Sequence, residues 1–202
     1  LQALTEGRID LLARNTTWNL SRDLGGGIDF VGINYYDGQG LMVRKSQQVR
    51  STLELDGVRI CVQAATTSED HIKDYFTENR MGYTAVYAES PEEALQIYAD
   101  GGCDALTSDQ SQLYGLRTRL QEPSQHRILP EVISKEPLGP AVRDDDPAWS
   151  DLVRWSLFTM INAEELKLTS ANVDRVRDQA SKPEVRGLLD LDGSSGKALG
   201  IA

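Results

Sequence analysis

The sequence has little basic charge, few histidines and cysteines, and no long apolar run. Its 21 basic and 31 acidic residues give a net charge of −10, which excludes a nucleic-acid partner because phosphate binding needs clustered Lys and Arg. No stretch approaches the ~20 apolar residues of a membrane-spanning helix, and Leu1 begins helix-like sequence without a basic region, so we expect no signal peptide in this chain. The two histidines, His71 and His126, are far apart and have no Cys or His at metal-ligand spacing. We therefore expect neither a metal site nor a cofactor.

The two cysteines lie beside apolar segments. Cys61 is inside the apolar run 58–62, and Cys103 stands just before another short apolar run. A disulfide needs Cα atoms within ~7 Å of each other. The alternative is a pair of reduced, buried thiols, and the residues alone leave both open.

Strand and helix patterns alternate along the middle of the chain. The clearest helix start is Ser90-Pro91-Glu92-Glu93, with serine as N-cap, proline at the first helical position and glutamate three residues after the cap. Alternation of this kind predicts parallel strands joined by helical crossovers. The predicted strands are 58–63, 83–87 and 104–108, and the predicted helices are 68–79, 91–99 and 110–120.

The flanking segments have a different pattern. They contain a short helix, an apolar run at 9–13, an extended stretch at 30–44, a strand candidate at 128–132, and helices at 147–165 and 171–180. We predict an α/β fold in two lobes. Residues 1–45 form part of lobe 1 and a hinge strand, 46–134 form lobe 2, and 135–202 form the return hinge, lobe 1 helices and a tail. A single continuous sheet is the alternative, since periodicity alone does not exclude it.

Ligands gather at the carboxyl ends of the strands in open α/β sheets. Polar residues follow three of the expected strands, at 9–13, 58–63 and 104–108. A helix start after Thr66-Thr67 favours a bound carboxylate, Arg22 offers it a bidentate partner, and Asp109 offers an acceptor to an ammonium group. A carboxylate site with an ammonium site predicts an α-amino-acid ligand. The candidate ligand-binding residues are Arg14, Asn15, Thr17, Arg22, Thr66, Thr67 and Asp109.

Each candidate also has a purely structural interpretation. Thr67 and Asp109 are ordinary helix N-caps, and Asn15 to Thr17 could cap the short helix that follows them. Arg22 could be a solvated surface arginine. No residue other than Asp109 suggests a general acid or base, so we expect no catalytic residues.

The same segments resemble the class II periplasmic binding proteins of polar and general L-amino-acid ABC transporters. The resemblance covers nearly the whole chain. It rests on a first-lobe ligand segment, a hinge strand, a second-lobe Gly-Thr-Thr loop, an ammonium-binding strand end and a return hinge, at 7–23, 36–40, 62–67, 102–110 and 134–140.

The resemblance implies a two-lobed periplasmic protein that closes on a free L-amino acid and delivers it to a membrane permease. By analogy Arg22 and the Thr67 amide hold the carboxylate, Asp109 holds the ammonium, and Asn15 and Thr17 assist. The family also implies a Cys61–Cys103 disulfide. Ala65 replaces the loop's usual glycine, which we expect to tighten the approach of the backbone to the ligand.

A family member would open with a further strand, helix and strand and continue past Ala202. We therefore expect a truncated chain with an incomplete first lobe beside an intact parallel-sheet second lobe. Its uncovered surface predicts a homodimer. One alternative is a truncated member that no longer binds amino acids and serves as an interaction or assembly protein. Another is a cyclohexadienyl-dehydratase-like enzyme.

Overall fold

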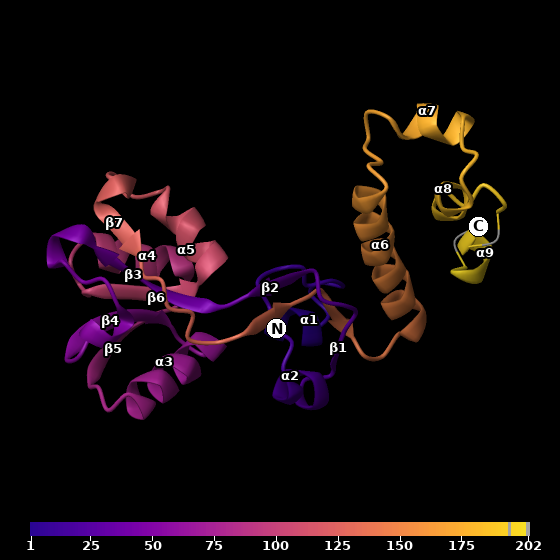
Figure 1. The fold of residues 1–202 in the computed structure, drawn as a ribbon. Coiled ribbons are helices and arrows are strands. Elements are labelled where there is room, and N and C mark those ends of the chain that lie inside the picture. Colours follow the sequence, from indigo (N-terminus) through magenta and orange to yellow (C-terminus); the bar gives the residue numbers. More distant parts are fainter. Residues whose placement is uncertain (194, 201–202) are drawn as a thin grey trace. The chain divides into compact units, whose positions relative to one another are not determined.

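A computed structural model describes residues 1–193 and 195–200 of the chain (Figure 1). It divides into two compact units, residues 1–34 with 138–202 and residues 35–137, called unit 1 and unit 2 below. Ser194, Ile201 and Ala202, all in the predicted tail, lie outside the described residues. Of the described helices, none is both long and apolar enough for a membrane crossing.

Unit 2 is built on a five-stranded sheet in the order β5-β4-β6-β3-β7. β4 pairs in parallel with β5 and β6, which confirms the predicted crossovers, whereas β3 runs antiparallel to β6 and β7. The sheet is therefore mixed rather than purely parallel. The strands are β3 (Gln39–Arg44), β4 (Val58–Gln63), β5 (Tyr83–Ala88), β6 (Ala105–Asp109) and β7 (His126–Ile128).

Helices cover both faces of this sheet. α3 (Thr67–Glu78) packs on one face through Ile72 and Phe76. α4 (Pro91–Ala99) and α5 (Gln110–Arg117) pack on the other through residues such as Leu95, Tyr98 and Leu113 (Figure 1). The Ser90 side chain accepts a hydrogen bond from the Glu93 N–H at 3.1 Å, as the capping pattern predicts. Short 3-10 turns are η1 (Lys45–Gln47), η2 (Thr52–Glu54) and η3 (Pro123–Gln125).

Two predicted extended segments are corrected. The stretch 30–44 is not one strand, because β1 (Ile28–Phe30), β2 (Tyr35–Asp37) and β3 lie in three different sheets. β3 is an inner strand of unit 2, since Leu41, Met42 and Val43 are fully buried between the helical layers on its two faces. The strand expected at 128–132 is β7, which ends at Ile128.

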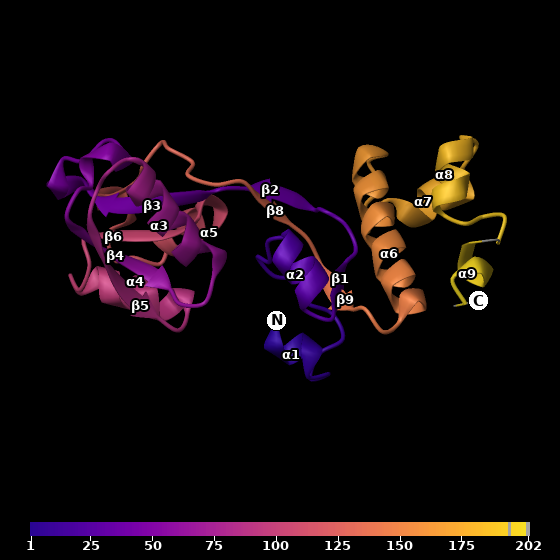
Figure 2. The same ribbon diagram turned by 90° about the horizontal axis from the view of Figure 1, so that it is seen from below.

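Unit 1 is organised around β1 and β9 (Ala141–Arg143), which pair antiparallel. α1 (Gln2–Thr5) and α2 (Leu20–Gly25) lie beside this pair (Figure 2). The apolar run 9–13 is not the strand that the sequence suggests, because only Leu12 forms a bridge, to Ala141.

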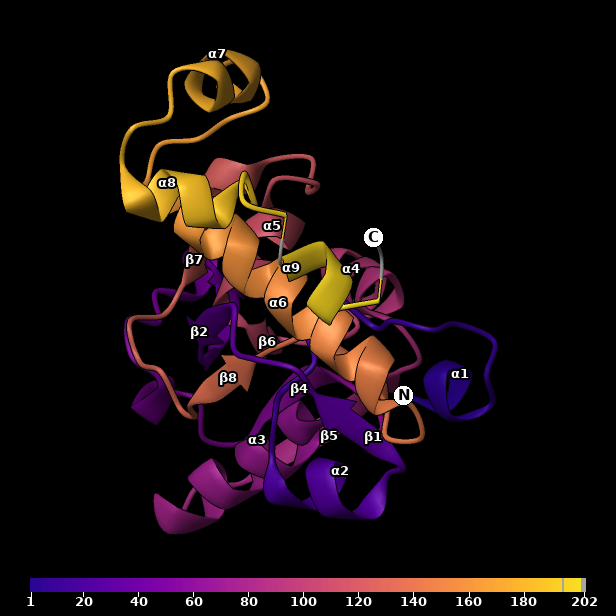
Figure 3. The same ribbon diagram turned by 90° about the vertical axis from the view of Figure 1, so that its right-hand side faces the viewer.

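The rest of unit 1 is helical. α6 (Pro147–Glu165) has the predicted bounds and packs Val153 and Trp149 against Val31 and Val142. Figure 3 shows α8 (Pro183–Leu188) and α9 (Ser195–Ala198) beside α6. α7 (Val173–Asp178) is shorter than the helix predicted there. β2 and β8 (Glu136–Leu138) form a separate two-stranded sheet where the chain enters and leaves unit 2.

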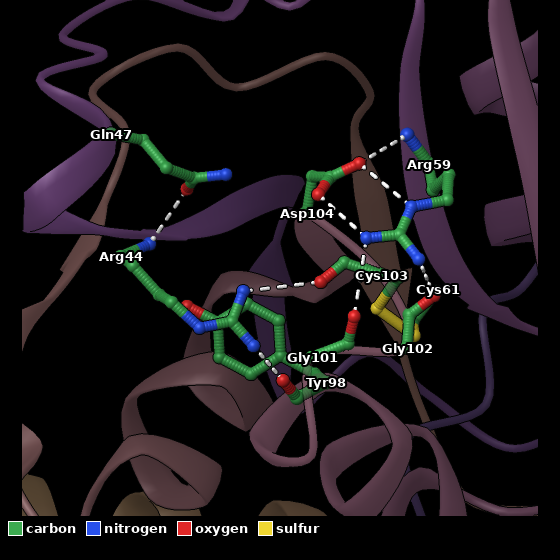
Figure 4. Close-up of polar contacts among 9 residues, drawn as sticks. All are labelled: Arg44, Gln47, Arg59, Cys61, Tyr98, Gly101, Gly102, Cys103 and Asp104. Atoms are coloured by element: carbon green, nitrogen blue, oxygen red, sulfur yellow. Dashed lines mark hydrogen bonds and ion pairs between the residues drawn. A yellow bond between two sulfur atoms is a disulfide. The ribbon is translucent and has the colours of Figure 1, made fainter.

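A disulfide joins Cys61 in β4 to Cys103, with Cα atoms 5.7 Å apart. The predicted pairing is thus confirmed, and the reduced-thiol alternative is wrong. Beside it Arg59 donates to the Asp104 carboxylate at 2.9 Å and holds the pKa of that carboxyl below its usual range (Figure 4). These two links fasten the start of β6 to β4.

A second arginine, Arg44, contacts residues next to the disulfide. The Arg44 guanidinium lies 4.4 Å from the centre of the Tyr98 ring and donates to the Tyr98 and Cys103 carbonyl oxygens (Figure 4). Burial raises the pKa of the Tyr98 hydroxyl, which lies 2.8 Å from His126 Nδ1. Burial, and then the Arg44 charge, lower the pKa of His126.

Replacing both cysteines by alanine should lower the free energy of unfolding of unit 2 by about 4 kcal/mol, because the bridge spans a sequence separation of 42 whose closure restricts the unfolded chain. Denaturant unfolding with and without dithiothreitol measures the loss. The reductant should destabilise the wild type and leave the double variant unchanged. Equal midpoints for both proteins in oxidising buffer would contradict this prediction.

Stability should also depend on pH through His126. Since its folded-state pKa is lowered, the unfolded chain binds more protons, and stability rises with pH until the unfolded pKa of about 6.5 is passed. The stabilisation is fully present above that pH and is lost as the pH falls toward the folded value. His126→Gln should flatten the slope of unfolding free energy between about pH 5 and 7. An unchanged slope in the variant would assign the dependence to other groups.

Candidate ligand-binding site

The loop between β4 and α3 is held by its own polar groups. The Ala65 N–H donates to Glu69 Oε2 at 3.1 Å, and the Thr66 hydroxyl donates to the Gln63 carbonyl oxygen at 2.8 Å. The N-cap of α3 is Thr66 and not Thr67, and its side chain makes no capping bond. Because a helix cannot pair its own first N–H groups, the start of α3 suits an anion.

Ala65 adopts a left-handed backbone conformation with φ +57°. This region costs a residue with a Cβ roughly 1–2 kcal/mol relative to right-handed conformations, which explains why a glycine is the usual choice in such a loop. The sequence identified the unusual alanine, and the structure shows that its consequence is backbone strain.

Asp109 ends β6 and precedes α5. It occupies the N-cap position, yet its side chain makes no capping bond. Instead the Asp37 carboxylate accepts the Ser111 N–H at 3.3 Å, and the Gly38 carbonyl oxygen accepts the Gln110 N–H at 2.8 Å. The Asp109 side chain is buried and therefore does not act as the N-cap of α5 that the structural interpretation expects.

Unit 2 brings its three candidates to one edge of the sheet. Thr66 and Thr67 follow β4, Asp109 ends β6, and these two strands are parallel neighbours with Cys61 opposite Leu106. Their carboxyl ends consequently lie at the same edge.

In unit 1, two of the four candidate residues, Thr17 and Arg22, are in direct contact. Arg22 Nη1 donates to the Thr17 carbonyl oxygen at 2.9 Å, so the guanidinium is held in place and is not simply solvated. Asn19, rather than any residue from Asn15 to Thr17, caps α2 by accepting the Arg22 N–H. Thr17 is buried, whereas Arg14 and Asn15 are exposed. Trp18 stacks on Phe30 with ring centres 5.4 Å apart and packs against the core of unit 1.

Sequence reasoning missed Asp37 and Glu69. Each accepts a hydrogen bond from a backbone N–H beside the candidate residues, Asp37 from Ser111 and Glu69 from Ala65. Glu69 stands three residues after the N-cap Thr66, a spacing typical of capping glutamates, so this signal was readable. Asp37 carries no such signal because its partner, Ser111, is distant in the sequence.

Comparisons with known proteins identify close relatives, although no family model matches the chain. The glutamate/glutamine/aspartate/asparagine-binding protein BztA of Rhodobacter capsulatus is 48% identical over 199 residues, covering 98% of this chain and 59% of that protein. The general L-amino acid-binding periplasmic protein AapJ of Rhizobium johnstonii is 48% identical over 201 residues, again 98% of this chain and 59% of that protein. The chain thus spans about three fifths of the length of these relatives.

A solved structure is equally similar. An ABC transporter periplasmic binding protein from Brucella ovis with glutathione bound matches with a TM-score of 0.95 and 48% identity, covering 100% of this chain and 64% of that chain. The predicted resemblance and the class II periplasmic-binding-protein fold are therefore confirmed. These relatives are named as binding proteins, not enzymes.

Replacing Ala65 by glycine should stabilise unit 2 by about 1 kcal/mol, because it removes the left-handed strain at a position that glycine tolerates. Thermal and denaturant unfolding measure the change. Ala64→Gly is the matched control, since Ala64 is not among the residues with positive φ and should lose stability through greater freedom of the unfolded chain. Destabilisation by both variants would show that the strain is relieved in solution.

Proposed function

We propose that this chain, which is homologous to amino-acid-binding proteins of ABC transporters over about three fifths of their length, binds the α-amino-carboxylate group of L-amino acids. The observation that supports this best lies in unit 2. There the start of α3 and the Asp109 carboxylate, which does not cap its own helix, follow neighbouring parallel strands. One element suits an anion and the other a cation, as a zwitterionic ligand requires.

Each candidate residue has a role in this proposal. The Thr67 amide and the Thr66 segment bind the ligand carboxylate, and Asp109 accepts hydrogen bonds from its ammonium group. In unit 1, Arg22 contributes the guanidinium for the carboxylate, and Asn15 and Thr17 add amide and hydroxyl groups. Arg14 adds a positive charge near the ligand's side chain or carboxylate. Binding makes and breaks no covalent bond.

The ligand class follows from chemistry shared by the relatives' ligands. BztA is named for four acidic and amide amino acids, and the Brucella ovis structure holds glutathione. The γ-glutamyl residue of glutathione carries a free α-ammonium and α-carboxylate, as a free amino acid does. We therefore propose that the chain recognises this head group and accepts side chains of different length, including a γ-glutamyl peptide.

The proposed location is the periplasm, where the ligand would pass to a membrane permease. AapJ is named as a periplasmic protein, and the Cys61–Cys103 disulfide is of a kind that persists in oxidising compartments. Homodimer formation stays a prediction.

Calorimetric titration with L-glutamate, L-glutamine and glutathione tests this function. Arg22→Ala and Asp109→Asn should each weaken binding by about 2–5 kcal/mol, because removing one partner leaves the opposite charge unpaired. N-acetyl-L-glutamate, which lacks the ammonium group, should bind poorly to the wild type and lose little further affinity in Asp109→Asn.

Two variants serve as matched controls. Arg8→Ala removes an exposed arginine that pairs with Glu6, and Asp100→Asn changes an exposed carboxylate beside Gln96; both should bind like the wild type. A wild-type protein that binds none of the three ligands would refute the proposed function for this chain.

A further inference from the structure

The core of unit 2 contains a completely buried amide side chain. Gln39, the first residue of β3, is 0% exposed. Its Nε2 donates to the Ser68 carbonyl oxygen at 2.9 Å and to Thr107 Oγ1 at 2.8 Å. One amide group therefore bridges the first turn of α3 and the strand β6.

The two ends of this bridge are the two halves of the candidate site in unit 2. Ser68 immediately follows Thr66-Thr67 at the start of α3, and Thr107 stands two residues before Asp109. Gln39 is also the residue opposite Asp109 in the β3–β6 register. The Thr107 hydroxyl donates to the Gly40 carbonyl oxygen at 2.9 Å, which fixes it as an acceptor for Gln39.

The backbone of Gln39 is held as firmly as its side chain. Its N–H donates to Ser134 Oγ at 3.2 Å, and its carbonyl oxygen accepts the Ile133 N–H at 2.9 Å. The chain just before β3 lies very close to residues 132–134. A Cβ at Gly38 would lie 2.7 Å from the Ser134 carbonyl oxygen and overlap the Val132 side chain. The Gln39 backbone is therefore held in place, and so is the position from which its side-chain amide extends.

Packing alone does not favour glutamine at this position. Gln39 Oε1 is buried and has no hydrogen-bond partner among the described residues, and burying an unpaired acceptor costs free energy. A methionine of similar length would avoid that cost. Among the described residues, the bonds to Ser68 and Thr107 are what an amide supplies at this position.

We propose that Gln39 is a positioning residue that sets the separation between the start of α3 and Asp109. It does not touch the ligand. This inference rests on the proposed function for its consequence, which is that Gln39 matches the spacing of the carboxylate and ammonium subsites to one α-amino-acid head group.

Gln39→Met tests the inference because it removes both donors and the unpaired acceptor at nearly constant volume. Ser68 keeps its place in the helix, and Thr107 keeps its bond to Gly40, so the unfolding midpoint should change little. Hydrogen exchange of the ligand-free protein should become several-fold faster at amides 66–69 and 108–111. Affinity for L-glutamate should fall about tenfold.

Thr52→Val is the matched control. Thr52 is also fully buried, and its hydroxyl lies 2.6 Å from the Tyr75 hydroxyl in the second half of α3. This variant should lose stability and leave both the affinity and the exchange at 66–69 and 108–111 unchanged. A double-mutant cycle of Gln39→Met with Asp109→Asn should be non-additive in binding, since the first change acts through the position of the second residue.

The outcomes separate this inference from the proposed function. Unchanged exchange at the two segments in Gln39→Met overturns the positioning role, whether or not a ligand binds. Faster exchange with unchanged affinity refutes the link to the subsites. A wild type that binds no ligand refutes the proposed function, while the exchange data still decide whether Gln39 holds α3 to β6.

Discussion

The parallel pairing of β4 with β6 is the contact on which the rest of unit 2 depends. The pairing itself is short, with Ile60 opposite Ala105 and Cys61 opposite Leu106. Its beginning is reinforced by the disulfide and by the Arg59–Asp104 ion pair. Both links join β4 to the segment just before β6, and the α3 loop and Asp109 follow the carboxyl ends of the same two strands. The disulfide and the ion pair therefore stabilise the two strands that carry the candidate site, although neither lies at the carboxyl ends where the site is.

β3 also helps to fix the positions of the candidate-site elements, because it runs antiparallel to its neighbours β6 and β7. An antiparallel strand in this position brings its own beginning, Gln39, opposite the end of β6 at Asp109. The residues just before and at the start of β3 thus reach both elements of the candidate site in unit 2. Asp37 accepts the Ser111 N–H of α5, and Gln39 donates to α3 and β6. A purely parallel sheet would place the beginning of this strand at the far edge, where neither contact could form.

Sequence reasoning succeeded where the cause of the structure is local. Ser90-Pro91 and its glutamates determine the start of α4, the apolar run of β4 determines that strand, and α6 has the bounds that Pro147 and its apolar face predict. It failed where the cause is distant. The run 9–13 is apolar but makes only one bridge, and Gln39 acts through partners 29 and 68 residues away. The candidate residues came from the polar positions after the predicted strands, whereas the Cys61–Cys103 pairing came from family resemblance, which carries long-range information that periodicity lacks.

If the proposed site binds an amino acid, the charges around the start of α3 explain why it would take a zwitterion rather than a simple carboxylate. Glu69 lies in the first turn, and the pKa of Tyr87 is raised mainly by its hydrogen bond to Glu69, so the phenol stays protonated and supports that carboxylate. Glu69 in the first turn stabilises the helix, but a carboxylate at this position opposes an incoming anion. A ligand that carries its own ammonium group offsets this repulsion by pairing with Asp109. In the proposed site, the acidic side chains that complete the fold of unit 2 would thereby select against carboxylates that lack an amino group.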